Sequence, residues 1–152
     1  MATEGRPTVS RDYFAQYHAD LISALPEEEA EKVRIKLGGA LLQPFIDSLG
    51  GQPLDHAQVK PRLEAYLRDE LEMADYVDVR VEGNEVAVEF KGCHLCHGND
   101  LLRQRGKSGF CPFAPGVNRA LSRGLRGGSR LESLTKPTGK TGECVIKYST
   151  GG

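Results

Sequence analysis

Residues 76–97 read YVDVRVEGNEVAVEFKGCHLCH, and this segment sets the organisation of the C-terminal half of the chain. Apolar and polar side chains alternate from Tyr76 to Val81 and again from Val86 to Phe90, with Gly83-Asn84 between the two runs. Such alternation around a Gly-Asn turn predicts a β-hairpin. Its second strand leads directly to Cys93-x-x-Cys96, so we expect this pair at a strand end, followed by a polar loop.

All four cysteines of the chain lie in its last 60 residues. A Cys-x-x-Cys pair presents two thiolates on one tight turn, and two further cysteines can complete a tetrahedron around a soft metal ion. The first residues contain no apolar run typical of a signal peptide, so we expect a cytoplasmic protein whose thiols stay reduced. The pattern therefore predicts a zinc site formed by Cys93, Cys96, Cys111 and Cys144.

Other uses of these cysteines remain open. Cys111 precedes Pro112, as a ligand of an iron-sulfur cluster often precedes proline, so a cluster held by the same cysteines is the alternative to zinc. His94 and His97 are alternative metal ligands in place of one thiolate. Residues 93–97 also satisfy the c-type haem signature, against which the expected cytoplasmic location argues. Thioredoxin-like chemistry requires the pair at the start of a helix in a βαβ unit, and the predicted hairpin argues against it.

Helical periodicity dominates the chain before the hairpin. Ser10 is a good N-cap for a helix whose predicted apolar face carries Tyr13, Phe14, Tyr17, Leu21 and Leu25. A second helix is predicted from Pro26 to Gly50-Gly51, with a weak point at Gly38-Gly39. A third helix is predicted over residues 55–74.

After the polar loop, periodicity predicts a short helix carrying Val117, Ala120, Leu121 and Leu125, then strands over residues 130–135 and 144–148. We therefore expect a single α+β domain, residues 1–152, in which N-terminal helices pack on an antiparallel sheet. Its parts are a helical region 10–75, the hairpin 76–91 and a cysteine-rich α/β region 92–150.

Charge is unevenly distributed along the chain. Residues 1–90 hold 9 Lys and Arg against 18 Asp and Glu, whereas residues 91–152 hold 11 against 3. Arg119, Arg123, Arg126 and Arg130 form a helical stripe that suits a carboxylate or phosphate, or a solvated face beside the acidic helices. No aromatic residues interleave with these arginines, which disfavours nucleic acid as a partner, and no segment is long and apolar enough to span a membrane.

Three motifs resemble the 4-vinyl reductase domain family, a group of hydrocarbon-binding proteins. They are Cys93-x-x-Cys96, the run Phe110-Cys111-Pro112-Phe113-Ala114-Pro115-Gly116, and the closing run from Thr141 to Tyr148. The resemblance implies an α+β fold related to trafficking-complex (TRAPP-like) subunits that enclose an acyl chain, a cysteine-rich zinc site beside a ligand pocket, and a homodimer. Cys111 and Cys144 match two zinc ligands of the family's sensory members. The middle Glu and Cys ligands of those members have no counterpart here, so Cys93 and Cys96 would replace them.

The sequence therefore predicts a domain that binds or senses a small apolar or amphipathic molecule and contains a structural zinc ion. Phe110 and Phe113 flank Cys111 and are candidate ligand contacts, together with Arg119 and Arg123 of the arginine stripe. An enzyme acting on a hydrophobic substrate is a further alternative. We identify no catalytic residues, because no Ser-His-Asp set or carboxylate pair stands out.

Overall fold

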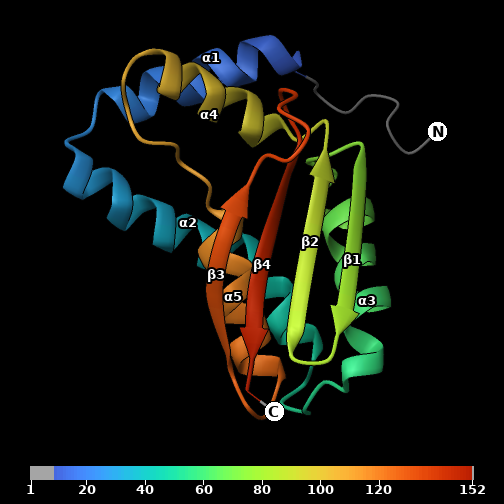
Figure 1. Cartoon of the computed structure of the whole chain (residues 1–152). Coiled ribbons are helices and arrows are strands. Elements are labelled where there is room, and N and C mark those ends of the chain that lie inside the picture. Colours follow the sequence, from blue (N-terminus) through green and yellow to red (C-terminus); the bar gives the residue numbers. More distant parts are fainter. Residues whose placement is uncertain (1–8, 152) are drawn as a thin grey trace.

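The computed structural model describes residues 9–151, which form one α+β domain (Figure 1). The helical elements are α1 (Arg11–Ser23), α2 (Glu27–Ser48), α3 (His56–Glu64), the π-helical turn η1 (Ala65–Glu70), α4 (His94–Gln104) and α5 (Phe113–Gly124). The strands are β1 (Tyr76–Glu82), β2 (Glu85–Lys91), β3 (Ser129–Thr135) and β4 (Cys144–Thr150). They form an antiparallel sheet in the order β1-β2-β4-β3. The predicted α+β class with an antiparallel sheet, the hairpin and the closing strands are confirmed.

One face of the sheet carries the main core. Val79, Val88 and Ile146 are paired across β1, β2 and β4 and are fully buried, under the layer formed by α2, α3 and α5 (Figure 1). On the opposite face Arg80 and Lys147 are exposed, which is the alternation expected of a sheet covered on one side. In the same register Phe90 pairs with Cys144, so the last cysteine lies on the core face.

Helix α2 continues through Gly38-Gly39, so the predicted weak point there is wrong. Backbone atoms of α2 and α5 touch at this position: a Cβ on Gly38 would clash with the carbonyl oxygen of Pro112, and a Cβ on Gly116 would lie 2.5 Å from the carbonyl oxygen of Gly38. Glycine costs a helix interior about 1 kcal/mol relative to alanine. Here the close helix packing that it permits offsets that cost.

The buried face of α1 differs from the predicted one. Ser10 caps the helix as expected, with its Oγ accepting from the Tyr13 amide at 3.1 Å. Tyr13 and Tyr17, however, are 66% and 58% exposed. The buried side chains are instead Ala15, His18, Ala19 and Ile22. Small alanines allow α1 to approach α4 closely, and the His18 ring fills the space beside Gly98, where a Cβ would clash.

Residues 94–104 form helix α4, where the sequence predicted a polar loop. Cys93 is the N-cap of this helix, and α4 lies alongside α1 across one end of the sheet (Figure 1). The third helix also ends earlier than predicted, at Glu70, through the π-helical turn. Within residues 9–151, no helix has the length and apolar character needed to cross a membrane.

Candidate metal centre

Three segments of the fold carry the four cysteines, and all four are buried in the main core. Cys93 caps α4, Cys96 lies in its first turn, Cys111 precedes α5, and Cys144 begins β4. All four are free thiols and none is more than 7% exposed. The Sγ atoms of Cys96 and Cys144 are 3.6 Å apart, although 48 residues separate them in the chain. We refer to these residues as the cysteine cluster.

The thiols of the cluster influence one another electrostatically. A hydrogen bond with the Cys96 thiol, followed by burial, raises the pKa of Cys93 well above its ordinary value. The pKa of Cys96 is raised chiefly by its hydrogen bond with Cys144, and the charge of Cys111 adds to this rise. Burial raises the pKa of Cys111 to about 11, with a further contribution from Cys93. The thiols of Cys93, Cys96 and Cys111 are thus each affected by at least one other thiol of the cluster.

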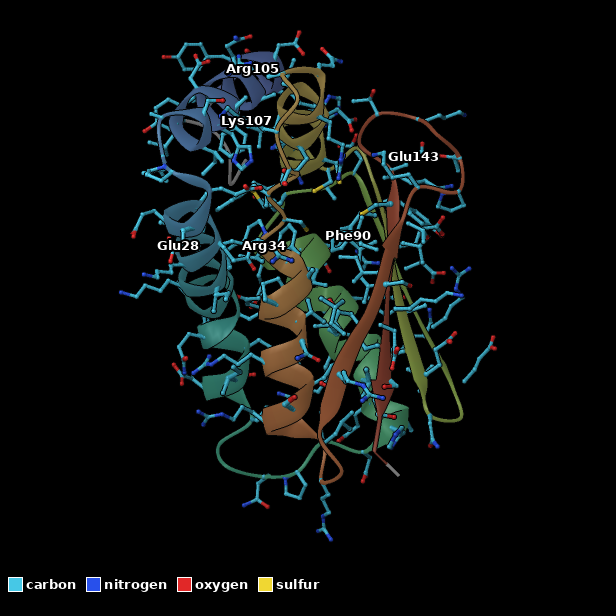
Figure 2. All side chains as sticks on the ribbon, turned by 60° about the vertical axis from the view of Figure 1, so that its left-hand side comes forward. Glu28, Arg34, Phe90, Arg105, Lys107 and Glu143 are labelled. Carbon is cyan, nitrogen blue, oxygen red and sulfur yellow. The ribbon has the colours of Figure 1, made fainter. Side chains whose placement is uncertain are left out.

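Backbone contacts fix the segments that carry the cluster. The Cys93 amide donates to the carbonyl oxygen of Gly142 at 3.0 Å, which joins the start of α4 to the turn before Cys144. From α2, the Arg34 Nε donates to the carbonyl oxygen of Cys111 at 3.0 Å, and Figure 2 shows Arg34 near the start of α5. Sequence reasoning missed Arg34, because it lies 77 residues from Cys111 and nothing local marks it.

Aromatic rings lie beneath the cluster and keep it in an apolar setting. Phe90, the strand partner of Cys144, stacks on Phe113 with ring centroids 5.1 Å apart. The Tyr148 hydroxyl donates to the carbonyl oxygen of Ala114 at 3.0 Å in the same buried region. Burial raises the pKa of Tyr148, and the neighbouring charges of Cys111 and Cys144 raise it further. A low-dielectric site of this kind disfavours bare thiolates and suits thiolates bound to a cation.

The donor chemistry of the cluster fits zinc, which binds readily to thiolates. Thiolates that bind zinc tetrahedrally at about 2.3 Å lie about 3.8 Å from one another. The separation of 3.6 Å between the Cys96 and Cys144 sulfurs is close to that spacing. Within the part of the chain that the structure describes, no three His, Cys, Asp or Glu side chains are already arranged to hold a metal ion.

The alternative ligands His94 and His97 have other neighbours. The His94 ring lies 6.0 Å from the ring of Phe14, and burial followed by the charge of Arg11 lowers its pKa. His97 packs against Gly142, where an added Cβ would be 2.9 Å from the His97 Nε2. His97 therefore lies beside the turn that leads to Cys144, whereas His94 faces α1.

The Cys-x-x-Cys pair lies at the start of a helix, a context that the sequence did not predict. Catalytic thiols at such positions have lowered pKa values, because the helix dipole and nearby cations stabilise the thiolate. Burial and neighbouring thiols instead raise the pKa of both Cys93 and Cys96. The pKa shifts of Cys93 and Cys96 therefore run in the direction opposite to that of activated thioredoxin-like thiols.

The predicted ligand contacts separate into different environments. Phe113 is 1% exposed and belongs to the main core. Phe110 is 3% exposed and lines a groove between α1, α2 and the loop after α4. Arg119 donates to the Gln43 side chain of α2 at 2.8 Å, whereas Arg123 is exposed near the end of α5. The structure therefore places the sulfurs of Cys96 and Cys144 in contact, with Cys93 and Cys111 buried in the same core, whereas the four predicted ligand contacts lie in different surroundings.

A scan against protein-family models and a search of curated proteins both find no match to this chain. The fold and the cysteine cluster are therefore the basis for assigning a function.

Proposed function

We propose that this chain is a small-molecule-binding or sensory domain whose C-terminal region is held together by a zinc ion on Cys93, Cys96, Cys111 and Cys144. The observation that carries the proposal is the contact of buried thiols from distant segments, with the Cys96 and Cys144 sulfurs 3.6 Å apart. A bound Zn²⁺ deprotonates coordinating thiols, and its charge removes the penalty of holding several thiolates in an apolar site.

The role of the ion in this proposal is structural. Four protein ligands leave no open position for an activated water, which disfavours metal-assisted hydrolysis. The ligands come from α4, the segment before α5, and β4, so one ion would fasten the α1–α4 pair to the sheet.

The ligand-binding part of the proposal is supported by the resemblance to the 4-vinyl reductase domain family, and with it we propose a fold relationship to TRAPP-like subunits. We also propose that the domain acts as a cytoplasmic homodimer. The exposed apolar face of α1, formed by Tyr13, Tyr17 and Leu21, supports this state, because a second copy would cover it. Sedimentation of the wild type and of a Tyr17→Lys variant tests this: a monomeric wild type contradicts the dimer.

Elemental analysis of freshly purified protein tests the metal assignment. We expect zinc at one ion per chain, a colourless protein, and loss of the metal when any cysteine of the cluster is changed to serine. His97→Ala is the matched control, because its ring lies beside the same segments. Retention of zinc in His97→Ala supports a four-thiolate site, whereas its loss identifies His97 as a ligand.

Iron with inorganic sulfide and a brown colour under anaerobic purification would favour the iron-sulfur alternative. A protein purified with neither metal, and unable to take up zinc, would contradict the proposal. Zinc that remains after all four cysteines are replaced would contradict it equally.

A further inference from the structure

A groove of about 830 Å³ lies between the corner that joins α1 to α2 and the loop after α4. We call residues 105–110 of this loop the strap. The lining is divided by chemistry: Ile22, Leu25, Ala30 and Phe110 are apolar, whereas carboxylates of the first turns of α2 and Lys107 of the strap are charged. Figure 2 shows Glu28 on α2 and Lys107 on the strap.

The apolar part of the groove belongs to a small core separate from the main one. Ile22 and Phe110 are buried together with Ala19 and Leu102, and Leu25 and Ala30 pack against them while partly exposed. An apolar lining that reaches solvent in this way favours an alkyl or aromatic group as its occupant, because covering it removes apolar surface from water.

The charged part of the groove is predominantly acidic. Its charged lining consists of three glutamates, Glu27, Glu28 and Glu31, and one lysine, Lys107. One carboxylate is engaged by the strap, since the Ser108 Oγ donates to Glu27 at 2.9 Å, and Glu31 accepts from Arg34 at 2.6 Å. The rim therefore attracts a cation placed next to the apolar lining.

We infer that this groove binds a small amphipathic cation, a molecule with an apolar chain or ring attached to a protonated amine or quaternary ammonium group. The inference rests on the proposed binding function and names the class of its ligand. The apolar portion lies against Ile22, Ala30 and Phe110, and the ammonium group lies among the carboxylates of α2.

The strap is held by contacts that can open to admit such a ligand. Arg105 pairs with Asp20 at 2.9 Å and donates to the Ser23 hydroxyl at 3.2 Å, in addition to the Ser108–Glu27 hydrogen bond. These are exposed polar links, which are weak because water competes for both partners. The strap ends at Phe110, directly before Cys111, so the groove adjoins a segment of the cysteine cluster.

Three probes with the same alkyl chain test the inference: octyltrimethylammonium, octanoate and octanol. Each is titrated below its micelle concentration into the full chain with the metal content that it has when purified, and binding is followed by calorimetry. We expect one ammonium probe per chain, bound at least about fivefold more tightly than octanoate, because the rim repels a carboxylate.

Variants locate the probe in the groove. Glu28→Gln is expected to weaken binding of the ammonium probe about threefold, because one exposed charge pair is lost, and to leave the affinity for octanol unchanged. Glu29→Gln is the matched control from the same turn, because Glu29 pairs with Lys32 at 3.6 Å and does not line the groove. Ala30→Trp is expected to fill the apolar lining and abolish binding of all three probes.

Octanoate that binds as tightly as the ammonium probe, or more tightly, would overturn the inference. The inference would also fail if the affinity for the ammonium probe were the same in the wild type, Glu28→Gln and Ala30→Trp. Glu28→Gln changes only a surface charge, so it remains informative if Ala30→Trp does not fold. Zinc content is measured independently. Octanol or octanoate bound elsewhere, with zinc present, would remove the groove assignment and leave the proposed function standing.

Discussion

The main core beneath the sheet and the layer formed by α1 and α4 are built differently. The main core is continuous and apolar, with Phe90, Phe113 and Ile146 fully buried between strands and helices. The α1–α4 layer contains a small cluster around Ala19, Ile22, Leu102 and Phe110, a buried histidine and an apolar outer face. Apolar burial dominates the first region, which also contains the cysteine cluster, whereas the second is connected to it through the two ends of the α4–strap segment, at Cys93 and Cys111.

Phe113→Ala should have the largest effect on stability. Phe113 stacks on Phe90 in the main core, and a buried phenylalanine changed to alanine costs about 3–5 kcal/mol. Urea denaturation measures this loss in the free energy of unfolding. Leu102→Ala, in the α1–α4 layer, should cost nearer to about 2 kcal/mol and should speed amide exchange mainly in α1 and α4. Equal costs with the same exchange pattern would mean that both regions unfold as one unit.

Cys111→Ala should lower the free energy of unfolding by more than about 2 kcal/mol, since loss of a structural metal removes its binding energy. Treating the wild type with a strong chelator should produce a similar loss, with amide exchange rising first in α4 and the strap. Thermal melting and metal content are the measurements. An unchanged melting temperature and metal content in Cys111→Ala would contradict the assignment of Cys111 as a ligand of a structural ion.

The adjacent glycines of α2 provide a matched pair for the main core. Gly38→Ala should cost about 1–3 kcal/mol, because the new Cβ meets the backbone of α5. Gly39→Ala should instead stabilise by about 0.5–1 kcal/mol, since its nearest neighbour is the flexible Arg119 side chain at 3.9 Å and alanine is the better helix former. Denaturant titration of both variants distinguishes the effects, and a shared sign would refute the packing explanation.

His18, buried between α1 and α4, should give the smallest effect, a dependence of stability on pH. Burial lowers its pKa, opposed by hydrogen bonding to Asn99 of α4 and to the Phe110 backbone. The unfolded chain therefore takes up the proton at a higher pH than the folded chain, so stability falls as pH drops below about 6.5. Unfolding measured between neutral pH and pH 5 should show a shallower slope for His18→Gln, and an unaltered slope would assign the dependence to other groups.

Local patterns predicted the parts of the fold that depend on neighbouring residues. The alternation around Gly83-Asn84 gave β1 and β2 with nearly the observed bounds, and Ser10 caps α1 as expected. Helix α4 was missed because Gly98 and Asn99 weaken its helical signal, and both are buried by packing on α1. The sequence assigned the exposed face of α1 to the core because that face carries the largest apolar side chains. The close packing of α1 on α4 instead buries the face with the small side chains of Ala15 and Ala19.

The order of residues was sufficient to establish an α+β chain with a hairpin, and to single out four cysteines as the residues with distinctive chemistry. Periodicity and turn formation act over a few residues, so they can be recognised from local order. The proximity of Cys96 to Cys144, the contact of Arg34 with Cys111 and the groove beneath the strap arose on folding. Each joins segments distant in the chain, and their meeting depends on how helices and strands pack, a property that no short segment contains.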